Sequence, residues 1–107
     1  MKKYKLDKFT GGWVAGDFDP AIIKTKDFEF MARYYTKGQT ETGHLHKIAD
    51  EISIFIYGKC VMDGEIFEKG DVLYIKAGES FQDFECLEDA ATAVIKTPSV
   101  IGDKYPI

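Results

Sequence analysis

The sequence has few of the features that mark cysteine-rich metal sites, disulfide-bonded folds and membrane-spanning segments. Its 107 residues contain two cysteines, Cys60 and Cys86, without a CxxC spacing or a secretory signal, so we expect two buried free thiols. No apolar run approaches the roughly 20 residues of a membrane helix, and the first residues lack an apolar signal core. These absences predict a cytoplasmic protein that has no membrane partner.

Positive charge is also scarce. The 14 lysines and arginines stand against 18 acidic residues, which gives a formal net charge of -4 and a pI near 5.1. The lysines are scattered among acidic residues and form no basic stripe that would follow a phosphate backbone. We therefore expect no nucleic-acid partner.

Helix signals are missing, because no segment combines a 3.6-residue apolar period with caps. Short apolar runs predict strands over residues 27–35, 51–57, 81–87 and 91–96, and Asp63-Gly64 between two further runs is a strong hairpin signal. With 45% hydrophobic residues, the chain has enough apolar material for one core. The sequence predicts a single all-β domain, residues 1–107, with the architecture of a sandwich or barrel.

The only two histidines, His44 and His46, are followed by Glu51. Residues i and i+2 of a strand share a face, so both imidazoles point the same way, roughly 6 to 7 Å apart along the chain. Glu51 has the opposite parity, so a turn over residues 47–50 must return it from a neighbouring strand. Two imidazoles and one carboxylate suit non-haem iron and also accept zinc, manganese, nickel or cobalt. We expect these three residues to bind a divalent metal ion; the alternative is an ordinary polar turn.

These residues resemble the first sequence motif of the cupin superfamily. Gly38, His44, His46, Glu51 and Gly58 match that motif spacing for spacing. The resemblance implies a small antiparallel β-barrel, the double-stranded β-helix or jelly roll, with its site inside the barrel. Cupins use that site for oxygenation, isomerisation, epimerisation, decarboxylation or plain ligand binding, so the resemblance implies the fold better than the function.

The second cupin motif is only partly present. Gly70 and Ala77-Gly78 stand in register with it, but Lys76 replaces the usual proline. Phe81 stands where the fourth ligand, a histidine, is usual, and Glu85 replaces the usual asparagine. A phenyl ring cannot coordinate a metal, so the complete four-ligand site cannot form from these positions.

Two residues are candidates for proton transfer. Asp83 has the strand parity of Phe81, and we expect it to face the interior as a replacement ligand or general base. A slip of one residue would bring Gln82 inward instead. We expect Asp83 or Tyr57 to move a proton if the chain is a metal-dependent enzyme. The alternatives are a non-catalytic binding module, in which Phe81 fills the fourth position, and a metal-free isomerase with a histidine base oriented by a carboxylate.

Further stretches are similar to small single-domain cupins encoded near surface-polysaccharide and sugar-nucleotide genes. These stretches are residues 11–18, 84–99 and 102–107. This similarity implies a role in carbohydrate metabolism and a sugar, sugar nucleotide or related acid as the ligand.

The strand over residues 51–57 has two unlike faces. If Glu51, Ser53, Phe55 and Tyr57 share the site face, the isoleucines at positions 52, 54 and 56 point outward. An exposed isoleucine row is an aggregation hazard unless another sheet, the N-terminal segment or a second subunit covers it. We expect a homodimer. By default Trp13, Tyr34 and Tyr57 belong to the core and Arg33 to the solvated surface, with a ring in a sugar pocket or an arginine on a carboxylate or phosphate as the alternatives.

Overall fold

The computed structural model of the chain describes residues 1–81 and 83–106. These residues form twelve β-strands and two short 3-10 helices, and they contain no α-helix. Accordingly, none of the described helices has the length and apolar character to cross a membrane. The predicted all-β class is confirmed.

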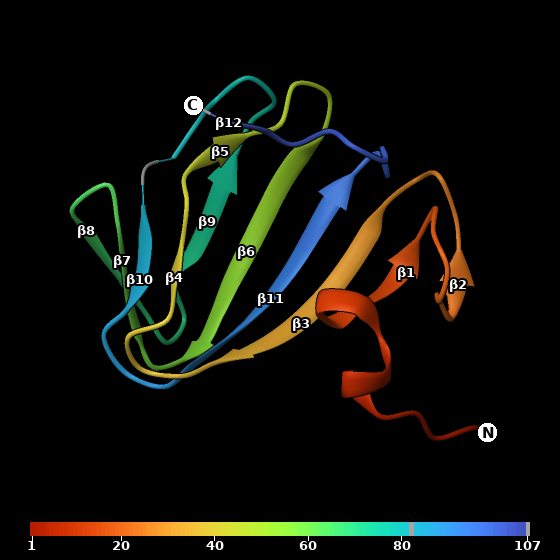
Figure 1. Cartoon of the computed structure of the whole chain (residues 1–107), viewed down its shortest axis with the longest axis horizontal. Coiled ribbons are helices and arrows are strands. Elements are labelled where there is room, and N and C mark those ends of the chain that lie inside the picture. The colour runs from red at the N-terminus through yellow and green to blue at the C-terminus, as the bar shows by residue number, and fades with distance from the viewer. Residues whose placement is uncertain (82, 107) are drawn as a thin grey trace.

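Three sheets make up the molecule (Figure 1). The six-stranded sheet, in the order β2-β1-β3-β11-β6-β9, consists of β1 (Trp13–Gly16), β2 (Ile23–Lys24), β3 (Glu29–Tyr35), β6 (Asp50–Tyr57), β9 (Val72–Ile75) and β11 (Ala90–Thr97). The four-stranded sheet, in the order β4-β10-β7-β8, consists of β4 (Thr40–Glu41), β7 (Lys59–Met62), β8 (Glu65–Glu68) and β10 (Phe84–Cys86). The remaining elements are the pair β5 (His44–Leu45) and β12 (Tyr105–Pro106) and the helices η1 (Leu6–Lys8) and η2 (Thr10–Gly12).

The core lies between the two larger sheets. Tyr35 and Phe55 from the six-stranded sheet pack in one buried cluster with Phe84 and the two cysteines from the four-stranded sheet. Cys60 and Cys86 are both 0% exposed, and their Sγ atoms are 3.7 Å apart. That distance is well beyond the ~2.05 Å of a disulfide. The prediction of two buried free thiols is confirmed.

The hairpins and turns follow the glycine signals of the sequence. β7 and β8 pair antiparallel across Asp63-Gly64, as predicted. At the end of β6, Gly58 has φ = 83°, and a Cβ there would collide with the Asp89 carbonyl oxygen. Only glycine fits this position without strain, which explains the last glycine of the motif.

Strand β6 alternates as predicted over most of its length. Ser53 and Phe55 are buried, whereas Ile52, Ile54 and Ile56 are 40%, 42% and 47% exposed. We call these three residues the outer isoleucine row. In the sheet, Ile52 lies opposite Ile95 of β11, which in turn lies opposite Phe30 of β3, so the apolar outer surface extends over several strands.

The prediction fails at the end of β6, where Tyr57 is 43% exposed. The pairing of β6 with β11 shifts register between Ala91 and Thr92, so Ala91 faces Tyr57 and Thr92 faces Phe55. Such a bulge adds an unpaired residue and changes the alternation of faces. Tyr57 therefore does not join the inward side chains of this strand.

Strand β3 also departs from the expectation. Tyr34 is 71% exposed, and the neighbouring Tyr35 is the buried tyrosine, at 6%. The inward face of β3 includes two charged residues: the buried Glu29, and the partly buried Arg33 that we expected in solvent. Arg33 borders the interior cavity, whereas Glu29 is paired with Lys96 and Ser99.

Candidate functional site

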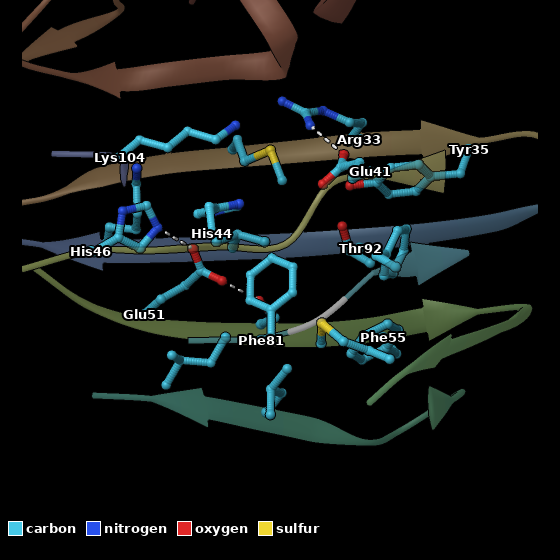
Figure 2. A pocket seen from close by; sticks show the side chains of 18 of the residues that line it. Arg33, Tyr35, Glu41, His44, His46, Glu51, Phe55, Phe81, Thr92 and Lys104 are labelled. Atoms are coloured by element: carbon cyan, nitrogen blue, oxygen red, sulfur yellow. Dashed lines mark hydrogen bonds and ion pairs between the residues drawn. The ribbon is translucent and has the colours of Figure 1, made fainter. Parts of the chain in front are cut away.

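The interior of the barrel holds a cavity of about 190 Å³. Figure 2 shows two polar clusters that point into it from opposite ends. We call His44, His46 and Glu51 the histidine end and Tyr35, Glu41 and Thr92 the tyrosine end. The ring of Phe81 projects into the space between the two ends.

The C-terminal segment positions His46. His46 is buried, with 4% of its surface exposed. Its Nδ1–H group donates a hydrogen bond to the carbonyl oxygen of Asp103. The carboxylate of Asp103 accepts hydrogen bonds from the backbone N–H groups of Lys47, Ile48 and Ala49, the turn that joins β5 to β6. A carbonyl oxygen can only accept, so Nδ1 carries a proton and a neutral His46 keeps its lone pair on Nε2.

The Nε2 atom of His46 lies beside the carboxylate of Glu51, 3.4 Å from Oε1. Ser53 donates a hydrogen bond of 3.2 Å to the other oxygen of this carboxylate. The Glu51 carboxylate raises the pKa of His46, and this effect outweighs burial, which lowers it. Burial raises the pKa of Glu51, but the contact with His46, the positive charge of Lys96 and the hydrogen bond from Ser53 together outweigh burial and leave that pKa below its ordinary value. The two groups therefore favour each other's charged forms.

His44 is the more open of the two histidines. Its ring centroid is 5.0 Å from that of His46 and 4.6 Å from that of Phe81, edge to face in both cases. Burial and then the positive charge of Lys104 lower the pKa of His44. A neutral imidazole is the form that binds a metal ion or accepts a proton.

The donor chemistry of the histidine end fits a divalent metal ion. The Nε2 atom of His46 is buried and has no hydrogen-bond partner of good geometry. An orphaned nitrogen that faces a carboxylate, with a second imidazole beside it, has the donor types that iron, zinc and related ions prefer. Within residues 1–81 and 83–106, however, no three His, Cys, Asp or Glu side chains are arranged as a ready ion site. The metal site therefore stays a prediction.

The two candidates for proton transfer lie outside the cavity. Asp83 is exposed and borders a shallow outer pocket with Val61 and Glu85. Its expected inward orientation is wrong, because β10 begins only at Phe84 and Asp83 itself lies outside the strand. Tyr57 is turned away by the bulge in β6. Gln82, the alternative to Asp83, lies outside the described residues.

Several residues of the site escaped the sequence analysis. Asp103 lies in a stretch noted only for its similarity to other cupins, and its role depends on contacts more than 50 residues away along the chain. Thr92, Tyr35 and Glu41 come from three strands, and no local pattern links them. The one signal in the sequence concerns Thr92, a polar residue between the alanines of a largely apolar strand.

Comparison with solved structures identifies the fold. Neither a family model nor a curated protein sequence matches this chain. An uncharacterized conserved protein with a double-stranded β-helix domain from Klebsiella pneumoniae matches with a TM-score of 0.69 and 16% identity, over 94% of this chain and 88% of that one. This chain has the double-stranded β-helix fold of the cupins.

Two further structures with this fold have more specific names. KdgF from Halomonas sp. matches with a TM-score of 0.62 and 21% identity, over 72% of this chain and 74% of that one. A sugar phosphate isomerase of the cupin superfamily from Silicibacter pomeroyi matches with a TM-score of 0.60 and 20% identity, over 68% of this chain and 52% of that one. At such identities the likeness establishes the cupin fold and leaves the activity to be argued from the site.

Proposed function

We propose that this chain is a small-molecule-binding cupin that holds a divalent metal ion with His44, His46 and Glu51. The observation that carries the proposal is the buried Nε2 atom of His46, which lacks a hydrogen bond of good geometry and lies 3.4 Å from the Glu51 carboxylate. A bound ion supplies a Lewis acid that polarises a carbonyl or enolate oxygen of a substrate. The reactions that suit such a site are isomerisation, epimerisation and oxygenation.

The chain's own residues supply orientation and proton transfer. Asp103 fixes the tautomer of His46, and Ser53 holds one oxygen of Glu51. Because Asp83 and Tyr57 lie outside the cavity, the carboxylate and imidazole at the histidine end are the groups available to hold or move a proton. In the metal-bound state His44, His46 and Glu51 would all be ligands, so proton transfer by these groups belongs to the metal-free protein.

A small anionic, sugar-related metabolite is the ligand class that we propose. Lys104 lines the cavity near His44 and has no ion-pair partner among the described residues. Its positive charge favours a carboxylate or phosphate on the ligand. The names of KdgF and of the sugar phosphate isomerase support carbohydrate metabolism by analogy of fold.

A metal-free proton transfer is the second candidate. It is favoured by the contact between His46 and Glu51, since a carboxylate beside a histidine orients the ring and stabilises its protonated form. A non-catalytic binding module is the third, supported by Phe81, which makes the middle of the cavity apolar where the usual fourth ligand would stand.

Metal content tests the proposal directly. Protein purified without a chelating tag and then exposed to Fe²⁺, Zn²⁺, Mn²⁺, Ni²⁺ or Co²⁺ in turn should retain an equimolar amount of one of them by elemental analysis. His44→Ala and Glu51→Gln should lose most of that metal while unfolding at nearly the same temperature as the unsubstituted protein. Asp83→Asn, outside the cavity, is the matched control and should retain it. Unsubstituted protein that binds none of the five ions contradicts the metal site and leaves the metal-free candidate.

A further inference from the structure

The tyrosine end of the cavity contains a buried hydroxyl group that lacks a hydrogen bond of good geometry to any described protein group. Thr92 of β11 is 4% exposed, and its Oγ1 atom has no hydrogen-bond partner of good geometry. Burying an unpaired hydroxyl lowers the stability of the fold, so such a group calls for a specific reason. Figure 2 shows this hydroxyl pointing toward the Tyr35 hydroxyl and the Glu41 carboxylate.

Arg33 fixes the Glu41 carboxylate and uses three of its five N–H groups on protein acceptors. Its Nε and Nη2 groups both donate to the carbonyl oxygen of Gly11, at 2.9 and 2.7 Å. Its Nη1 group donates to Glu41 Oε1 at 3.2 Å. These bonds hold the guanidinium at the edge of the cavity and leave Glu41 as an oriented acceptor inside it.

Tyr35 provides a neutral hydroxyl at the same place. Burial, followed by the negative charge of Glu41, raises its pKa to about 12 against the smaller opposing effects of Arg33 and of the nearby Thr92 hydroxyl, so the Tyr35 hydroxyl keeps its proton at neutral pH. The tyrosine end therefore presents two hydroxyl groups, each of which can donate or accept, and one carboxylate that accepts. All three groups line the same cavity.

We propose that the tyrosine end binds the hydroxyl groups of a short polyhydroxy acid, whose carboxylate lies at the histidine end near Lys104. This inference rests on the proposed binding of a small anionic molecule in the cavity. Adjacent hydroxyl groups of a ligand would donate to Glu41 and pair with Thr92 and Tyr35, which gives the Thr92 hydroxyl its missing partner.

The shape and lining of the cavity suit this class. Its volume of about 190 Å³ limits the ligand to a compact molecule. The apolar side chains of Met62, Phe81 and Phe84 also line it and can contact the carbon chain. A complete sugar nucleotide exceeds this volume.

The test uses two four-carbon acids, the trihydroxy acid erythronate and the unhydroxylated butanoate, with binding measured by calorimetry. The unsubstituted protein should bind erythronate more tightly than butanoate. Thr92→Val keeps the shape of the side chain and removes the hydroxyl, and it should weaken erythronate binding by about three- to tenfold while leaving butanoate unchanged. Thr36→Val, at an exposed threonine outside the cavity, is the control and should change neither affinity.

Thermal unfolding of the ligand-free protein gives a second readout. Because the Thr92 hydroxyl has no hydrogen bond of good geometry in the ligand-free fold, Thr92→Val should unfold at the same temperature as the unsubstituted protein or at a higher one. A lower unfolding temperature would mean that the hydroxyl has a structural partner, and it would overturn the proposal. The proposal is equally overturned if erythronate binds no more tightly than butanoate, or if Thr92→Val binds erythronate with unchanged affinity.

Metal content measured on the same samples separates this inference from the metal site. Equimolar metal in a protein without preference for erythronate supports the proposed metal site and overturns the hydroxyl subsite. A preference for erythronate that disappears in Thr92→Val, in a protein that binds no metal, supports the subsite and contradicts the metal site.

Discussion

Replacing Asp103 by alanine should destabilise the protein strongly and release His46. The buried carboxylate accepts hydrogen bonds from the backbone N–H groups of Lys47, Ile48 and Ala49 at 2.9, 3.1 and 2.9 Å. Ala49 is 3% exposed, so its N–H group cannot turn to water instead. A buried donor without a partner costs about 1–3 kcal/mol, and each of the other two bonds contributes about 0.5–1.5 kcal/mol. The sum, about 2–6 kcal/mol, is a large part of the ~5–15 kcal/mol that stabilises a small domain.

The loss should depend on pH in a defined direction. Burial alone would raise the pKa of Asp103, but the hydrogen bonds from Ala49, Lys47 and Ile48 lower it below the ordinary value of 3.8. A carboxylate whose pKa is lowered by folding stabilises the protein above its unfolded pKa, and this contribution disappears as the pH falls through the folded pKa. The difference in stability between the unsubstituted protein and Asp103→Ala should therefore be largest near neutral pH and shrink in acid.

Urea unfolding followed by Trp13 fluorescence measures both effects. Asp71→Ala is the matched control, because the Asp71 carboxylate accepts one exposed backbone hydrogen bond, from Glu68 at 2.8 Å. This control should lose only about 0.5–1.5 kcal/mol. An NMR titration should also show a lower pKa for His46 in Asp103→Ala. If the two variants unfold at the same urea concentration, or if His46 titrates unchanged, the C-terminal segment does not hold His46 and the reasoning is refuted.

Three further predictions follow from the cavity and from the outer face. In the metal-free protein the pKa of His46 should lie above the ordinary histidine value of 6.5 and the pKa of His44 below it, as measured by NMR titration. The reverse order would contradict the positions of the Glu51 carboxylate beside His46 and of the Lys104 charge near His44. We propose that a second copy of the chain covers the outer isoleucine row. Sedimentation should then show a dimer that Ile54→Glu converts to a monomer, whereas the control Ile66→Glu, on the exposed face of β8, should remain dimeric. An unsubstituted protein that sediments as a monomer would rule this out. Asp83→Asn should bind erythronate with the same affinity as the unsubstituted protein in calorimetry. A clear loss of affinity would show that the Asp83 carboxylate belongs to the site.

The sequence predicted those parts of the structure that depend on neighbours along the chain. The hairpin at Asp63-Gly64, the turn that brings Glu51 back to the histidines, and the outward isoleucines of β6 all follow from alternation and turn residues. The motif spacing led to the cupin fold, because it encodes both the strands and the glycine turns between them.

The sequence failed where contacts between distant strands decide. The bulge that turns Tyr57 outward arises from the pairing of β6 with β11, and the inward charges of β3 have partners from distant segments, Lys96 and Ser99 for Glu29 and Glu41 for Arg33. The choice between Tyr34 and Tyr35 as the buried ring was therefore open in the sequence. The unpaired hydroxyl of Thr92 becomes visible only when every neighbouring donor and acceptor has a position.

Along strand β6, side chains that face the interior alternate with the exposed isoleucines of the outer isoleucine row. This alternation constrains how the chain can evolve. Inserting or deleting one residue after Glu51 would exchange the two faces, so isoleucines would enter the cavity and Ser53 and Phe55 would face outward. The register of β6 from Glu51 to Phe55, before the bulge, is therefore constrained. Changes of ligand preference in descendants of this chain should arise by substitution on the inward positions, and changes of length should be confined to turns such as Asp63-Gly64.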